Sequence, residues 1–351
     1  MTDDRWLGPI MALGSALIFG ASTPFAKLLL GGGTDPGLLA GLLYLGSGCG
    51  LAVFWLARRA AGMRPEASLQ RTDTPWMLLV ILFGGILGPL LLMLGLKVTP
   101  ATTASLLLNV EGLATMAIAW LVLRENVDRK LLLGALSILT GAILLSWTGG
   151  PQAAGWGALM IAAGCICWGI DNNLTRKISG SDPVQIAAIK GLAAGIVNLV
   201  IALGQGSVLP SLPVVAISAL LGLAGYGLSL VLFVLALRHL GSARTGAYYS
   251  VAPFIGAIAS ILILHDPVTL QLCGAALLMG IGVYLHLAES HGHDHQHEAL
   301  DHEHRHVHEE HHRQDHGAGD PPGEPHTHRH HHAPLRHKHP HYPDLHHHHR
   351  H

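Results

Sequence analysis

Long apolar runs without a charged residue constrain the fold of this chain more than any other feature. Seven such runs lie before residue 290: Trp6–Ala26, Pro36–Ala57, Pro75–Leu96, Leu131–Ile170, Gly191–Leu237, Thr245–Leu264 and Pro267–Leu285. A bilayer core of roughly 30 Å needs about 20 apolar helical residues. The five shorter runs therefore each hold one span. The two longest hold two each, divided at residues 149–151 and 204–213, which are rich in Gly and Pro.

Val98–Leu123, apolar except for Glu111, adds one more span, and the apolar segment from Pro183, which includes Lys190, extends the run that begins at Gly191. We predict an all-α integral membrane protein with ten transmembrane helices, because helices satisfy their own backbone hydrogen bonds in lipid. The spans are expected near residues 7–29, 36–57, 75–96, 99–123, 130–147, 155–177, 183–204, 213–237, 244–264 and 268–287. The first run is long and no small-residue cleavage site follows it, so no cleavable signal peptide is expected.

Basic residues in the short loops predict the orientation. With a cytoplasmic N-terminus, the even-numbered loops carry eleven basic residues and the odd-numbered loops carry Lys97 alone. Cytoplasmic loops are enriched in Lys and Arg. Both termini are therefore expected in the cytoplasm of a multi-pass protein of the cell (inner) membrane.

The chain also repeats itself. Residues 101–126 align with 242–267 at a constant offset of 141, and residues 19–27 align with 168–176. We expect two five-helix units, residues 1–147 and 148–288. Because five is odd, the second unit must cross the membrane in the opposite sense. Inverted repeats typically place a substrate site near the midplane and support alternating access.

These duplicated motifs resemble the EamA-type exporters of the drug/metabolite transporter superfamily. The resemblance rests on Phe19-Gly20 and Trp168-Gly169, on a basic residue seven positions beyond each Gly (Lys27, Arg176), and on the acidic residues Glu125 and Asp266. It implies a secondary transporter that exports amino acids, drugs or other small metabolites. The chain departs from the family in having Glu111-Gly112 where a proline is usual and His265-Asp266 where Gly-Glu is usual. A buried carboxylate at Glu111 would favour a cation or a proton.

Four ionisable residues lie inside predicted spans, where such side chains tend to face a cavity or a partner. Lys27 is near the outer end of its span and can extend its ammonium to the interface. Asp171 and Lys190 fall at similar depth, which predicts an ion pair that serves either as a structural clasp or as part of a gate. Glu111 lies near mid-bilayer without an evident partner. It is a candidate for proton coupling or for binding a cationic group, or else a neutral acid hydrogen-bonded within the bundle.

Polar and aromatic neighbours could complete a cavity. Ser22, Thr23, Asn172 and Asn173 lie within the aligned motifs of the first and sixth spans. Tyr248 and Tyr249 could stack on a planar substrate or simply pack. The predicted substrate-binding or coupling residues are therefore Thr23, Glu111, Asp171, Asn172, Lys190, Tyr248 and Tyr249.

Residues 289–351 form a tail of different composition, with 24 of the chain's 27 histidines. We expect it to be disordered until it binds something, because almost nothing in it can form an apolar core. Alternating His-x-His brings several imidazoles within reach of one ion, and imidazole suits Zn, Ni, Co and Cu. The predicted metal ligands are His291, His293, His295, His297, His302, His304, His306 and His308.

Three functions remain open. The leading one is a secondary transporter that exports small organic metabolites or amino-acid-like solutes by alternating access, with a metal-binding cytoplasmic tail. The second is an exporter of Ni, Co or Zn fed by the tail, and the third is a metal-sensing or metal-storing membrane protein. The sequence lacks the nucleotide-binding and hydrolase motifs that we sought, so we expect no enzyme and no required cofactor. The expected partners are lipid, a small-molecule substrate and divalent metals at the tail, without nucleic acid, for a monomer or homodimer.

Overall fold

A computed structural model divides the chain into two compact units, a helical core (Met1–Glu289) and the tail (Ser290–Pro343). In the core it describes residues 7–62, 69–123, 129–147, 155–178, 181–233, 235–236 and 248–287. In the tail it describes residues 292–296, 300–306, 326–332 and 336–340.

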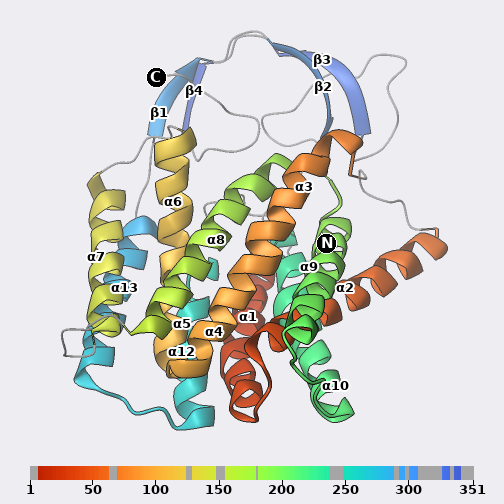
Figure 1. The fold of residues 1–351 in the computed structure, drawn as a ribbon. Helices are drawn as coiled ribbons and strands as arrows, with labels where there is room; N and C mark the ends of the chain where they lie inside the picture. Colours follow the sequence, from red (N-terminus) through yellow and green to blue (C-terminus); the bar gives the residue numbers. More distant parts are fainter. Residues whose placement is uncertain are drawn as a thin grey trace. The chain divides into compact units, whose positions relative to one another are not determined.

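The described part of the core is helical (Figure 1). The elements are α1 (Leu7–Gly31), α2 (Pro36–Ala60), η2 (Arg71–Asp73), α3 (Thr74–Val80), η3 (Ile81–Leu87), α4 (Gly88–Val98), α5 (Ala101–Leu107), α6 (Asn109–Leu123), α7 (Arg129–Ser146), α8 (Trp156–Ile178), α9 (Pro183–Gly204), α10 (Leu212–Gly222), η4 (Leu223–Leu228), α12 (Ala252–Leu264) and α13 (Leu270–Leu287).

Among the described residues, six helical segments are long and apolar enough to cross a membrane: Leu7–Gly31, Pro36–Ala60, Arg71–Val98, Ala101–Val122, Pro183–Gly204 and Leu212–Phe233. Three shorter apolar helices, Leu132–Ser146, Ala252–Leu264 and Leu270–Leu285, coincide with further predicted spans. The helix α8 coincides with the span expected near 155–177. The all-α membrane fold is confirmed, and the total of ten crossings stays a prediction.

The second helix of each predicted unit begins with the same signal. Asp35 precedes Pro36 at the start of α2, and its side chain accepts a hydrogen bond from the backbone N–H of Leu38. Asp182 precedes Pro183 at the start of α9, and its side chain accepts one from the N–H of Val184. An acidic N-cap satisfies a free N–H, and proline at the first helical position loses no hydrogen bond. The local sequence thus fixes where both helices start.

Two helices that cross the core contain a π-helical segment. The segment η3 lies between α3 and α4, and η4 follows α10. A π-helical turn shifts the backbone hydrogen bonds from i→i−4 to i→i−5, and such turns often occur at functional sites. Both segments are rich in glycine, with Gly84 and Gly85 buried in η3 and Gly225 and Gly227 buried in η4.

Corresponding helices of the two predicted units pack against one another in antiparallel fashion. In α2 and α9, Gly41 lies against Leu199, whereas Gly48, further along α2, lies against Leu192, earlier in α9. A Cβ added to Gly48 would be 2.3 Å from the backbone N of Leu192, so glycine permits this close approach. Figure 1 shows α7 and α13 side by side at one edge of the bundle, and they also run antiparallel, since Gly141 lies against Ala275 and Gly282 against Gly134. This is the relation that inverted repeats require.

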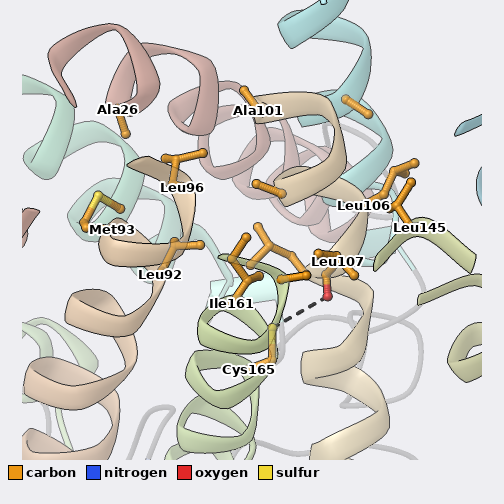
Figure 2. Packing of buried hydrophobic residues seen from close by; sticks show 14 of the residues in the cluster. Ala26, Leu92, Met93, Leu96, Ala101, Leu106, Leu107, Leu145, Ile161 and Cys165 are labelled. Carbon is orange, nitrogen blue, oxygen red and sulfur yellow. Dashed lines mark hydrogen bonds between the residues drawn. The ribbon is translucent and has the colours of Figure 1, made fainter. Parts of the chain in front are cut away.

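The largest apolar cluster joins helices from both predicted units. Leu92, Met93 and Leu96 of α4 and Leu106 and Leu107 of α5 pack with Ile161 and Cys165 of α8, as Figure 2 shows. Ala26 of α1, Leu145 of α7, and Leu272, Ala275 and Met279 of α13 belong to the same cluster. The Cys165 thiol donates a weak hydrogen bond of 3.7 Å to the carbonyl of Leu107. Dense packing of this kind holds α8 in a fixed position beside α4 and α5.

The described part of the tail contains four short strands. β1 (Gly292–Gln296) pairs with β4 (Arg336–Pro340), and β2 (Leu300–His306) pairs with β3 (His326–His332), both antiparallel. Both ladders have only two strands, and an isolated two-stranded ladder is marginally stable at best in water. The expectation that the tail becomes ordered on binding stays a prediction.

Candidate functional site

The site is built around the carbonyl of Gly84 in η3. This oxygen accepts two side-chain hydrogen bonds, from the Tyr44 hydroxyl at 2.8 Å and from the Trp168 Nε1 at 3.1 Å. The next carbonyl, that of Gly85, accepts one from Asn198 Nδ2 at 3.2 Å. Side chains from α2, α8 and α9 therefore converge on the π-helical segment.

An ion pair lies beside the same two glycines. Lys190 of α9 donates to Asp171 Oδ2 of α8 at 2.5 Å, and the side chains are only 12% and 7% exposed. Thr175 donates to the other carboxylate oxygen at 3.2 Å. A Cβ added to Gly84 would lie 2.1 Å from the Asp171 carboxyl, so the absence of a side chain there makes room for the pair. The ion pair that was predicted from the depth of the two residues is present. It lies against Gly84 of η3, a segment of a third helix.

Glu111 of α6 contacts Asn172, the residue next to Asp171 in α8. Its Oε1 accepts a hydrogen bond of 3.0 Å from Nδ2 of Asn172, and the same nitrogen is 3.2 Å from Thr115 Oγ1. Asn172 is exposed and Glu111 is half-buried. The sequence revealed no partner for Glu111, and the structure supplies this one from the other predicted unit. Asp171 and Lys190 lie within electrostatic reach of the Glu111 carboxyl.

The neighbouring Asn173 fixes α8 against α6. Its Nδ2 donates to the carbonyls of Gly169 at 2.8 Å and Thr115 at 3.1 Å. A Cβ added to Gly169 would lie 2.8 Å from the Cβ of Ala114, so the two helices touch here. Close packing and the Asn173 bonds together set the position of Asn172 relative to Glu111.

The remaining predicted residues lie in different surroundings. Thr23 is buried in α1. Tyr249 packs against Phe19 and Phe233, with ring centroids 5.9 Å and 4.8 Å apart. Tyr248 is 37% exposed, so the two adjacent tyrosines do not face one common site. The structure brings together Glu111, Asp171, Asn172 and Lys190, but Tyr248 lies outside that group.

Sequence reasoning missed Tyr44, Trp168 and the two π-helical segments. Trp168 was noted only for its part in the repeated motif. The glycines of the two π-helical segments could have indicated them in the sequence, because Gly84 and Gly85 of the first predicted unit correspond to the region of Gly225 and Gly227 in the second. The correspondence extends to contacts, since Gly84 packs against Asp171 and Gly225 packs against Ser22, which aligns with Asp171 in the repeat.

The predicted metal ligands lie in the tail. His293 and His295 lie in β1, and His302, His304 and His306 lie in β2, while His291, His297 and His308 are outside the described residues. Within the ranges given above for the described chain, no group of three or more His, Cys, Asp or Glu residues is arranged to hold a metal ion.

Comparison with known proteins gives consistent results. The profile of the EamA-like transporter family matches twice, over residues 6–147 and 155–288. An uncharacterized transporter of Methanothermobacter thermautotrophicus is 28% identical over 301 residues, covering 80% of this chain and 86% of that protein. The uncharacterized transporter YyaM of Bacillus subtilis is 23% identical over 285 residues, covering 77% and 90%. A protein of known crystal structure matches with a TM-score of 0.59 and 19% identity, covering 79% of this chain and 94% of that one, which supports the fold alone.

Proposed function

Because the chain belongs to the EamA-like transporter family, we propose that it exports a small organic or amino-acid-like solute through the site around Glu111, Asp171, Asn172 and Lys190. The family and the two relatives named as transporters establish a multi-pass membrane transporter of the drug/metabolite type and indicate a transporter rather than an enzyme. The solute class, the direction and alternating access are the proposed part.

The observation that carries the proposal is the hydrogen bond from Asn172 to Glu111. It joins the two predicted units, and Glu111 lies in the segment Ala101–Val122, which is long and apolar enough to span a membrane. Ionisable side chains in such helices are costly and usually mark a pathway. The Glu111 side chain accepts a hydrogen bond there from a neutral donor, the Asn172 amide. A carboxyl group held by a neutral donor can exchange it for a cationic group or a proton.

The charges next to Asn172 favour a solute that carries both signs. Lys190 presents an ammonium, and Asp171 and Glu111 present two carboxyl groups, all within electrostatic reach of one another. A solute with an amine and a carboxylate complements this set, because each of its charged ends would find an opposite charge. Binding such a solute would compete with the Asp171–Lys190 pair, which would let the pair serve as part of a gate.

Flux in proteoliposomes tests the proposal. We expect Glu111→Gln to lower uptake of radiolabelled amino acids and to remove the dependence of the rate on pH, since glutamine cannot exchange a proton. Gln271→Ala is a matched control, because Gln271 hydrogen-bonds to Leu144 and Trp147 in the α7–α13 pair, away from the site. Amino-acid flux with unchanged pH dependence in Glu111→Gln would refute the coupling role.

The cytoplasmic position of the termini is also proposed. Basic side chains stack on aromatic rings at the ends that the loop charges place in the cytoplasm, with Arg59 over Trp55 at 5.5 Å and Lys177 over Trp76 at 4.1 Å. Aromatic and basic residues of this kind favour the membrane interface. Protease accessibility of the tail in right-side-out and inside-out vesicles would test the orientation.

The tail supports a second proposal, that it binds transition metal ions. The support is its sequence, with 24 histidines in 289–351 and repeated His-x-His spacing. Calorimetry with Ni²⁺ on the full chain and on a chain lacking 291–351 would test binding. If deletion abolishes Ni²⁺ flux and amino-acid flux is absent, metal export replaces the leading function. If neither cargo moves and the tail binds metal, a sensing or storage role is favoured.

A further inference from the structure

Lys27 of α1 caps the end of a different helix. Its Nζ donates to the carbonyls of Leu96 at 2.7 Å, Lys97 at 3.0 Å and Thr99 at 2.9 Å. The first two lie in the last turn of α4, whose final carbonyls have no partner within the helix and carry its negative partial charge. An ammonium has three hydrogens, and here each has an acceptor. The Lys27 side chain therefore ties α1 to the connection between α4 and α5.

Asp266 holds the other side of the same connection. Its Oδ2 accepts hydrogen bonds from the backbone N–H of Thr102 at 2.9 Å and from the Thr102 hydroxyl at 2.8 Å. Thr102 is in the first turn of α5, where a carboxylate is favoured by the positive end of the helix dipole. Asp266 follows His265, which turns the chain at the end of α12 with a left-handed φ of 55°. Asp266 also lies within electrostatic reach of Lys27.

These contacts join the two predicted units at one end of the core. Lys27, residues 96–99 and Thr102 come from the first unit, and Asp266 comes from the second. We call this set the outer clamp, because the loop charges place this end on the outer face of the membrane. The central site around Glu111 and Asn172 does not share any of these contacts.

Beneath the outer clamp, α1, α5 and α12 meet through small residues. A Cβ added to Gly20 would lie 2.3 Å from the carbonyl oxygen of Ala252, and one added to Gly256 would lie 2.8 Å from Ser105 Oγ. Ser105 is fully buried, and its hydroxyl has no hydrogen-bond partner among the described residues. A buried hydroxyl without a partner is unfavourable and would gain hydrogen bonds if water entered. Separation of these helices would let water reach the Ser105 hydroxyl and supply its missing hydrogen bonds.

We propose that Lys27 and Asp266 close the outer end of the transport pathway. Release of a solute to the outside then requires both side chains to break their hydrogen bonds to the α4–α5 connection. The inference rests on the proposed function, because it assigns the clamp a place in alternating access. Lys27 acts as a positioning residue, since it holds backbone groups and is separate from the central site.

The test measures access to Ser105 from the outside. In the full chain, with Cys49, Cys165, Cys167 and Cys273 replaced by alanine, Ser105→Cys is the reporter. The protein is reconstituted in right-side-out vesicles and labelled with a membrane-impermeant maleimide. We expect Lys27→Met to raise the labelling rate by about tenfold or more, because the rate follows the population of the open form. Asp266→Ala should have a similar effect.

Lys130→Met is the matched control. It makes the same substitution at an exposed lysine of α7, which is not part of the outer clamp, and it should leave labelling unchanged. If Lys27→Met does not elute as a single folded species, Lys27→Arg and Asp266→Ala carry the test. Arg keeps the charge but changes the donor geometry, so an intermediate rate is expected.

Unchanged labelling in every folded variant would overturn the proposal, as would an increase seen only in inside-out vesicles. The measurement needs no solute. Its failure is therefore distinguishable from failure of the proposed export, which the flux assay tests.

Discussion

Breaking the pair of Asp171 and Lys190 tests whether it stabilises the core or mainly serves transport. Removing one partner of a buried ion pair costs about 3–5 kcal/mol, because the other charge is left unpaired. The two side chains are 7% and 12% exposed, and Thr175 still donates to Asp171. Lys190→Met is therefore expected at the lower limit, about 3 kcal/mol of unfolding free energy.

Asp171→Asn should cost less, about 1–2 kcal/mol, because the flexible Lys190 side chain can reach other acceptors or water. The double variant Asp171→Asn/Lys190→Met leaves no unpaired charge. It should be more stable than Lys190→Met alone, with a coupling energy of about 2 kcal/mol.

Unfolding in mixed micelles of detergent and SDS gives the free energies for the four proteins of this cycle. Amino-acid flux measured on the same samples separates a structural role from a gating role. If the destabilisation of the double variant equals the sum of the two single variants, or if both single variants match the native protein, the two charges are not coupled and the reasoning fails.

Three further predictions concern the packing around this pair. Gly84→Ala places a Cβ 2.1 Å from the Asp171 carboxyl and should lower both stability and flux. Gly112→Ala is its control, because a Cβ there meets nothing within 4 Å. This variant should unfold at the same SDS concentration as the native protein or at a higher one. Tyr44→Phe removes a donor to Gly84 and should cost about 1 kcal/mol, measured in the same titration; no loss would mean that the bond from Trp168 suffices. Gly48→Ala forces α2 from α9 and should cost about 1–3 kcal/mol; an unchanged midpoint would contradict the close approach.

The membrane fold and one site contact followed from sequence because they depend on distance along a helix. Apolar length predicted the spans. Nearly equal distance of Asp171 and Lys190 from the connection between their helices predicted their ion pair, since each residue advances the helix by about 1.5 Å. The depth of two residues in the membrane does not show which other helix lies beside them. The contact of the ion pair with Gly84 was therefore not predictable in this way.

Contacts that depend on how the two predicted units pack against each other could not be predicted from the sequence. Glu111 and Asn172 are in different units, and their hydrogen bond arises only when α6 packs on α8. Tyr248 and Tyr249 look equivalent in the sequence, but adjacent helical residues point in different directions. Only Tyr249 therefore enters the aromatic cluster with Phe19 and Phe233.

The way in which Lys27 binds has a consequence for how this protein can change in evolution. Its three acceptors are main-chain carbonyl oxygens, which every amino acid supplies. Selection on these bonds would act on position 27 and leave the side chains at 96, 97 and 99 free to vary. In a saturation mutagenesis experiment read out by growth, we expect position 27 to be intolerant while position 97 accepts most substitutions. Covariation between residue pairs would not detect this interaction, because the acceptors are main-chain carbonyl oxygens, which do not change when the side chains at these positions change.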